Sequence, residues 1–301
     1  MSLVINNNIP ALNVANNLSR HYGALMTSTR RLSSGLRVGT AADDAAGLAI
    51  RELMRADIAA YKQGIRNAND AISLIQTADG ALQIIDEKLI RMKELAEQAA
   101  TGTYDSTQRL MIESEYQAMA SEITRIANQT NFNSVKLLDG SLTGDHIGGS
   151  SANLNSSGKL KIHFGPNNNS AEDYYYIEIG SSTASSLGLG NQSNEATAGF
   201  AISTQSAAQA ALVAITEAIV SKDKIRAALG ALQNRLQNTV SNLTIQAENL
   251  QAAESRISDV DVATEMTTFV RNQILSQAAA ILDVLRGVAM GHGVLLQDFI
   301  G

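Results

Sequence analysis

Apolar residues recur along most of the chain at the spacing of helices that pack against one another. From Tyr61 onward they follow alternating steps of three and four residues, the pattern of a coiled-coil seam. Two successive steps of three around Ile75 and Ala78 break this alternation and predict a local overwinding of the helix. The seam positions are Ile65, Ala68, Ile72, Ile75, Ala78, Leu82, Ile85, Leu89, Met92, Ala96 and Ala99.

Two further helices follow this one. The sequence TGTYDS at residues 101–106 reads as a turn, and a second helical pattern runs over residues 112–126. A third pattern is nearly unbroken over residues 212–260, and a helix of about 50 residues would be roughly 75 Å long. The residues of this helix that we expect to face residues 82–92 are Leu236, Leu243 and Leu250. The pattern therefore predicts a mostly α fold, an elongated antiparallel coiled-coil or helical rod.

A region of different composition separates the second and third helices. Residues 139–206 are dominated by Gly, Ser, Asn and Thr. Within them, residues 159–164 (KLKIHF) and 174–179 (YYYIEI) alternate and carry β-branched or aromatic side chains, which favours two short strands joined by a turn. The region predicts a small β-hairpin with loops rather than a second large domain.

Both ends of the chain carry weaker helical seams. Heptad spacing extends over residues 12–32 and again over residues 270–288. Because isolated helices of this length are marginal in water, each seam needs a partner. That partner is either the other terminus or another molecule.

Composition narrows the classes of function. The chain has no cysteine, which excludes disulfides and thiolate metal sites, and its formal net charge is −6. Lys and Arg are scattered, so we expect no nucleic-acid partner. The N-terminus lacks the features of a secretory signal peptide, and no stretch is long and apolar enough to insert into a membrane. By these rules alone the protein would be assigned to the cytoplasm.

The sequence offers little for enzyme chemistry. The four histidines are far apart and lie in no metal-ligand pattern, so we expect no catalytic residue, no metal site and no cofactor. The pair Asp43–Asp44 could be read as catalytic carboxylates. Its place just before AAGLAIRELM favours a different reading, in which the two aspartates cap the next helix.

Several long segments closely resemble bacterial flagellin, the subunit of the flagellar filament. They are, in chain order, SLVINNNIPALNVANNLSR, RLSSGLRVGTAADDAAGLAIRELM, GIRNANDAISLIQTADGAL, NFNSVKLLDG and IRAALGALQNRLQNTVSNLTIQAENLQAAESRISDVDVATEM. The resemblance implies a self-assembling structural protein of bacterial motility, in a minimal form that lacks the outer variable domains. A hook–filament junction protein, which has similar termini, is the alternative.

The resemblance also implies a division into domains. Residues 1–42 with 263–301 would form an inner core domain, and residues 43–262, including the hairpin and loop region 139–206, an outer core rod. A spoke of small residues around positions 33–47 would connect them and serve as a joint in assembly, with its counterpart on the return strand in SRISDVDVATEM. The spoke residues singled out are Ser34, Gly35, Asp43, Asp44 and Gly47.

The family further implies a route and partners. Flagellins leave the cell through a type III export channel without a cleaved signal, so the resemblance moves the expected location to the extracellular filament. Besides copies of itself, the implied partners are an export chaperone at the C-terminal region, the filament cap and the hook-associated proteins. Residues 279–301 depart from the usual Gln/Ala/Asn-rich ending with its Pro-Gln pair.

A host protein is the last implied partner. Flagellins that activate the flagellin-sensing Toll-like receptor present an Arg and a Leu on the first long outer helix and a Glu on the next. The matching residues are Arg91, Leu95 and Glu115. Since Arg91 and Leu95 lie off the seam predicted above and four residues apart, we expect both to be exposed on one helical face.

Overall fold

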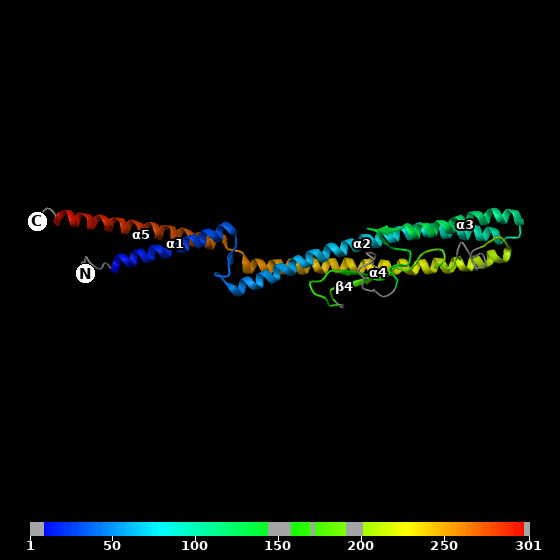
Figure 1. The fold of residues 1–301 in the computed structure, drawn as a ribbon, viewed down its shortest axis with the longest axis horizontal. Coiled ribbons are helices and arrows are strands. Elements are labelled where there is room, and N and C mark those ends of the chain that lie inside the picture. Colours follow the sequence, from blue (N-terminus) through cyan, green and yellow to red (C-terminus); the bar gives the residue numbers. More distant parts are fainter. Residues whose placement is uncertain (1–8, 144–157, 170–171, 191–200, 298–301) are drawn as a thin grey trace, which may run out of the picture. The chain divides into compact units, whose positions relative to one another are not determined.

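The computed structural model describes residues 9–143, 158–169, 172–190 and 201–297. Five helices account for most of this part of the chain: α1 (Ile9–Ser34), α2 (Ala45–Ala100), α3 (Ser106–Gln129), α4 (Gln205–Ser258) and α5 (Val262–Gln297) (Figure 1). The chain divides into two compact units. Unit 1 comprises Met1–Ile58 and Glu248–Gly301, and unit 2 is Ala59–Ala247. The domain limits implied by the family resemblance, after residues 42 and 262, remain a prediction.

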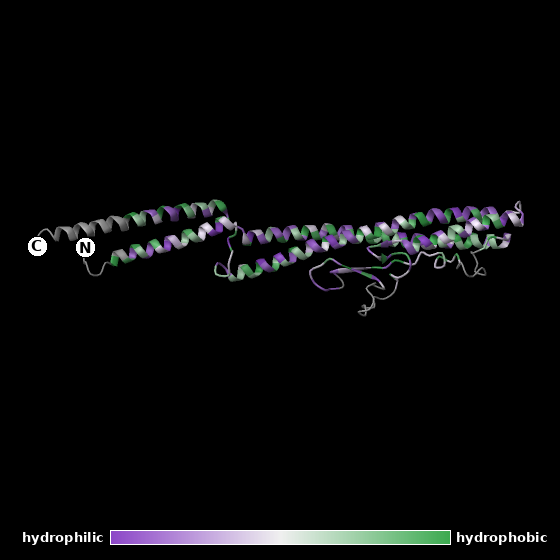
Figure 2. Cartoon of the chain, turned by 45° about the horizontal axis from the view of Figure 1, so that its top comes forward, coloured by the Kyte–Doolittle hydropathy of each residue, from purple (hydrophilic) through white to green (hydrophobic). Residues whose placement is uncertain are grey.

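Unit 2 is built on three helices that lie side by side (Figure 1). The α2 helix spans 56 residues and α4 spans 54, as the long helical patterns predicted. Apolar and polar residues alternate along each helix (Figure 2), and the apolar positions form one continuous core. The mostly helical class is thereby confirmed, and it rests on amphipathic faces that bury each other.

The apolar seam of α2 is more regular than the sequence suggested. Ten of its buried positions are each 2% exposed or less and follow steps of three and four: Ala68, Ala71, Ile75, Ala78, Leu82, Ile85, Leu89, Met92, Ala96 and Ala99. Leu74 and Leu95 are buried beside this series. The doubled step of three on which the predicted overwinding rested arises because Ile72, which is only partly buried, was counted in place of Ala71. In a helix pair that packs closely, the small alanine occupies the seam and the larger isoleucine flanks it.

The alignment of α4 against α2 also differs from expectation. The Lys222 ammonium binds the Asp86 carboxylate, and Arg226 Nε donates to Asp79 Oδ1 at 2.7 Å. Residues 79–86 of α2 are therefore opposite residues 222–226 of α4. Leu236 and Leu243 are buried as predicted, but they lie further toward the start of α2 than residues 82–92. The spacing of apolar residues shows which face of a helix is buried. Its axial position against a neighbouring helix is shown only by specific side-chain pairs such as Lys222–Asp86.

Two small antiparallel sheets accompany the helices. Strands β3 (Leu160–His163) and β4 (Tyr174–Ile177) pair with Ile162 opposite Tyr175, which confirms the predicted strands. Strands β1 (Asn131–Phe132) and β2 (Val135–Lys136) were not anticipated. Their two-residue turn has positive φ at Asn133 (48°) and Ser134 (67°), which is the backbone of a tight hairpin. Within the predicted loop region 139–206, residues 144–157, 170–171 and 191–200 lie outside the described part of the chain.

The β3–β4 sheet is fastened to two helices. Asn67 Nδ2 of α2 donates to the His163 carbonyl at 2.8 Å, and the Arg235 guanidinium of α4 lies 3.6 Å from the centre of the Tyr175 ring. A Cβ on Gly64 would lie 2.0 Å from the Phe164 carbonyl oxygen, so the sheet approaches α2 where only glycine leaves room.

Unit 1 has almost no apolar core of its own. The α1 and α5 helices lie side by side (Figure 1), yet of the apolar side chains described in this unit only Val38 and Ile58 are buried. Many large apolar side chains of the two helices are more than 40% exposed, among them Ile9, Leu12, Met26, Val270 and Ile274. The terminal seams therefore pair with each other and still leave most of their apolar surface uncovered.

Candidate assembly and recognition surfaces

The connecting segment, residues 33–47, leaves α1 through a tight backbone turn. Gly35 has φ +72°, a left-handed conformation that favours glycine, and its N–H donates to the Arg31 carbonyl at 2.8 Å. The hydroxyl of Ser34 accepts the Leu36 N–H at 3.2 Å. The first two predicted spoke residues thus end a helix and redirect the chain.

The connecting segment pairs with the chain that returns from α4. Leu36 and Asp259 form an antiparallel bridge, in which Arg37 N–H donates to the Ser258 carbonyl at 2.7 Å and Val260 N–H to the Gly35 carbonyl at 3.0 Å. The return strand predicted in SRISDVDVATEM is confirmed. Two backbone hydrogen bonds therefore connect the connecting segment to the chain that follows α4.

Asp43 and Asp44 have different roles. Asp44 Oδ1 accepts the N–H groups of Ala46 and Gly47 at 3.1 and 3.0 Å, so it caps α2 as predicted. A Cβ on Gly47 would lie 2.5 Å from Asp44 Oδ2, which explains the glycine beneath the cap. The prediction that Asp43 also caps this helix was wrong, because Asp43 turns back toward the preceding residues.

Asp43 instead binds Thr40 and α1. Its Oδ2 accepts the Thr40 N–H at 3.1 Å and the Thr40 hydroxyl at 2.8 Å, and its Oδ1 lies 2.7 Å from Arg30 Nη2. The hydrogen bond from the Thr40 hydroxyl, followed by its backbone N–H and the charge of Arg30, lowers the pKa of Asp43. The carboxylate form therefore holds the connecting segment against α1.

Three charged residues that the sequence reading missed complete this joint. Arg51 is 7% exposed, and its Nη1 donates to the Val38 carbonyl at 2.6 Å. Glu265 of α5 accepts the Ser28 hydroxyl at 2.5 Å, and Arg31 Nη1 lies 3.8 Å from the other Glu265 oxygen. None of these contacts has a local spacing signal, because each joins residues that are far apart in the sequence or that meet through backbone carbonyls.

On unit 2, Arg91 and Glu115 meet across α2 and α3. Arg91 Nε and Nη2 donate to Glu115 Oε1 at 3.0 and 2.8 Å, and Arg91 Nη1 donates to Glu94 at 3.0 Å. Hydrogen bonds from Glu115 first, and from Glu94, raise the pKa of Arg91. The Arg91 and Glu115 side chains are 49% and 44% exposed, so the pair offers charge and planar hydrogen-bonding groups to a partner.

Leu95 does not belong to this exposed surface. Its side chain is 1% exposed, so the expectation of an exposed Arg–Leu pair was wrong. On a seam formed by α2 and one partner helix, Leu95 would lie outside the buried stripe. In the structure α2 packs against α3 as well as α4, and a helix with two neighbours buries a wider stripe.

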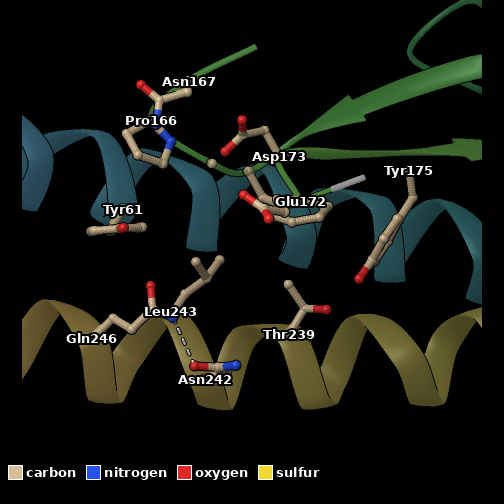
Figure 3. Close-up of a pocket in the computed structure, with 12 residues that line it drawn as sticks. Tyr61, Pro166, Asn167, Glu172, Asp173, Tyr175, Thr239, Asn242, Leu243 and Gln246 are labelled. Carbon is tan, nitrogen blue, oxygen red and sulfur yellow. Dashed lines mark hydrogen bonds between the residues drawn. The ribbon is translucent and has the colours of Figure 1, made fainter. Parts of the chain in front are cut away.

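A cavity of about 410 Å³ lies in unit 2 beneath the β3–β4 sheet (Figure 3). Its floor comes from Thr239, Asn242 and Gln246 of α4, and Gln246 Nε2 donates to Asn242 Oδ1 at 3.0 Å. The Asp173 carboxylate accepts the Asn169 N–H at 2.7 Å, which stabilises the turn above. None of the residues that line this cavity is a His, Cys or Lys, and among the described residues no cluster of three or more His, Cys, Asp or Glu could hold a metal ion.

Within the described ranges, no helix has a segment that is both long enough and apolar enough to cross a bilayer.

Two segments of the chain match regions that define a known protein family. The bacterial flagellin N-terminal helical region matches residues 5–143, and the bacterial flagellin C-terminal helical region matches residues 212–284. Together these matches include α2, α3, the connecting segment and nearly all of α4.

Whole-chain relatives agree with these matches. A flagellin of Bacillus subtilis is 42% identical over 291 residues, covering 91% of this chain and 93% of the relative. A flagellin of Halalkalibacterium halodurans is 39% identical over 277 residues, covering 92% of this chain and 93% of the relative. A solved structure of a putative flagellar hook-associated protein from Vibrio parahaemolyticus covers 72% of this chain and all of its own, with a TM-score of 0.54 and 14% identity. That last likeness shows the fold alone.

Proposed function

The chain belongs to the bacterial flagellin family, and we infer from this that it polymerises with copies of itself as the structural subunit of a flagellar filament. The family is one of structural proteins rather than enzymes. The observation that supports this proposal most strongly is the exposed apolar surface of α1 and α5 in unit 1. Its helices pair, yet Leu12, Met26 and Ile274 are 64%, 71% and 59% exposed, and such a surface calls for burial against neighbouring molecules.

Assembly on neighbouring subunits would use these exposed stripes. Each large apolar side chain that becomes fully buried contributes about 1.5–3 kcal/mol. If each subunit gained several such contacts, the polymer would be stable even though unit 1 of a single monomer has almost no apolar core.

Seeded growth tests this function directly. Purified protein is added to short sheared filaments of a related flagellin and followed by electron microscopy. A filament subunit extends the seeds into long tubes. Seeds that stay at their starting length would favour the alternative, a hook–filament junction protein, because an adaptor of that kind does not add to itself indefinitely.

We further propose that the subunit is exported and works outside the cell. The family resemblance supports passage through a type III export channel, with an export chaperone at the C-terminal region and contacts to the filament cap and hook-associated proteins. Immunogold labelling of intact cells, with and without the export apparatus, checks the location. Label along filaments only in the export-competent cells is expected, and label confined to the cytoplasm in both would contradict it.

Recognition by the flagellin-sensing Toll-like receptor is a second candidate function. It is favoured by the exposed pair Arg91–Glu115, which brings together two of the three residues matched to the family pattern. Leu95 lies beneath this surface and would support it rather than touch the receptor. Arg91→Ala should weaken binding of monomer to the receptor ectodomain at least tenfold, about 1.4 kcal/mol.

The control for this experiment is Arg125→Ala. Arg125 is 58% exposed and also forms an ion pair within its own surface, with Glu122 at 2.5 Å. Its loss should leave receptor affinity unchanged. Equal affinity of the Arg91→Ala variant and the parent would refute the proposed recognition site.

A further inference from the structure

A single lysine interrupts the buried apolar series of α4. Every seventh residue from 208 to 243 is at most 6% exposed, and these residues are Ala208, Ile215, Lys222, Leu229, Leu236 and Leu243. At the centre of the series Lys222 is 1% exposed. The heptad spacing places Lys222 on the same seam as its apolar neighbours.

The Lys222 ammonium is paired on both sides. It binds Asp86 of α2 and lies 2.8 Å from Asp223 Oδ1 on its own helix. One turn further along, Arg226 pairs with Asp79 of α2 at 2.7 Å. The two helices are thus connected by two ion pairs, of which the one at Lys222 lies in the core.

Both ion pairs, Lys222–Asp86 and Arg226–Asp79, can form at the observed alignment of α2 and α4. The acids of α2 are seven residues apart, whereas the bases of α4 are four residues apart. If α4 moved by seven residues in one direction, Lys222 would meet Asp79, but Arg226 would meet Ile72. If it moved in the other, Arg226 would meet Asp86 and Lys222 would meet Lys93. Either displacement breaks at least one of the pairs.

The apolar residues discriminate less. A shift of seven residues returns apolar side chains to apolar positions, since the α2 seam repeats Ala, Leu and Ile with heptad spacing. A buried ion pair adds little net stability relative to an apolar pair of the same size, but leaving one member buried without its partner is destabilising. Single polar residues at core positions of coiled coils are known to select one alignment in this way.

We propose that Lys222 is the positioning residue that sets the axial register of α4 against α2. The Lys222–Asp86 pair acts together with the Arg226–Asp79 pair, because a displacement by one heptad in either direction leaves at least one of these pairs broken. The register is a property of one chain, and its test on monomer is independent of whether the chain polymerises.

The experiment measures a distance between the two helices in the full chain. Because the chain has no cysteine, Gln83→Cys on α2 and Gln209→Cys on α4 give two spin-label sites at exposed positions. Double electron–electron resonance then reports the label-to-label distance. The parent should show one distance, and Lys222→Met should add a second population displaced along the helix axis by about 10 Å, the rise of seven residues.

Two controls separate register from charge and from general damage. Lys222→Arg keeps a cation beside Asp86 and should retain the single parental distance. Lys224→Met removes an exposed lysine from the same helix and should also leave the distance unchanged. A single, unshifted distance in Lys222→Met would overturn the proposal. Loss of helical circular dichroism in that variant would overturn it too, because the pair would then supply stability rather than register.

Discussion

Leu236→Ala tests the assignment of the unit 2 core. Leu236 is fully buried on the α4 seam. Truncation removes three carbons, worth about 2.4 kcal/mol at 0.8 kcal/mol per methylene, and leaves a cavity between α2 and α4. With the cavity included, the expected loss in free energy of unfolding is about 3–4 kcal/mol. For a unit of this size, that lowers the melting temperature by roughly 6–15 °C.

Urea unfolding of the monomer, followed by circular dichroism, measures the loss. The urea concentration at the midpoint of unfolding should fall, while the m-value, the slope of the unfolding free energy against urea concentration, should stay unchanged. This is expected when stability changes without a change in the surface exposed on unfolding. Leu110→Ala is the matched control, since Leu110 on α3 is 58% exposed and its truncation should change stability by less than about 0.5 kcal/mol. A loss below about 1 kcal/mol for Leu236→Ala would refute the assigned core.

The other two substitutions test the hairpin contact and the connecting segment. Gly64→Ala should destabilise unit 2 by about 1–3 kcal/mol and increase hydrogen exchange in β3, because the new methyl would collide with the Phe164 carbonyl. Gly80→Ala is the control and should be stabilising, because a Cβ at Gly80 would have nothing within 4 Å. Equal effects of the two substitutions on stability would contradict this packing. The pKa of Asp43 is lowered in the folded chain, so its stabilising contribution is present above its ordinary value of 3.8 and is lost as pH falls through the lower folded value. The protection factors of the amides in residues 35–44, which correct for the intrinsic pH dependence of exchange, should therefore fall on acidification below about pH 4 in the parent and be less pH-dependent in Asp43→Asn. Identical protection profiles would refute the role of this carboxylate.

The sequence was sufficient to predict the long helices, the β3–β4 strands and the return strand of the joint. Each of these depends on local spacing or on a long matching segment. The cap at Asp44 followed from its place one residue before α2. Its neighbour Asp43 was misassigned because two adjacent aspartates look alike in the sequence, whereas only one of them faces the first N–H groups of the helix.

What the sequence did not reveal depends on which helices meet. Leu95 looked exposed until α3 was placed beside α2, and Ile72 was assigned to the seam position that Ala71 occupies. Lys222 looked like an interruption because its partner Asp86 is 136 residues away. The spacing of residues along one helix does not reveal such contacts between helices. These contacts determine the axial register of two helices and the width of the buried stripe on each.

Hydrogen exchange on monomer and on filament tests the central claim, that the helices of unit 1 obtain their apolar burial from neighbouring subunits. We predict rapid exchange in monomer for residues 12–32 and 266–281, since only Val38 and Ile58 are buried among the described apolar residues of this unit. The same amides should become strongly protected in filament, while residues 68–99 are protected in both states. Strong protection of residues 12–32 in monomer would contradict the account.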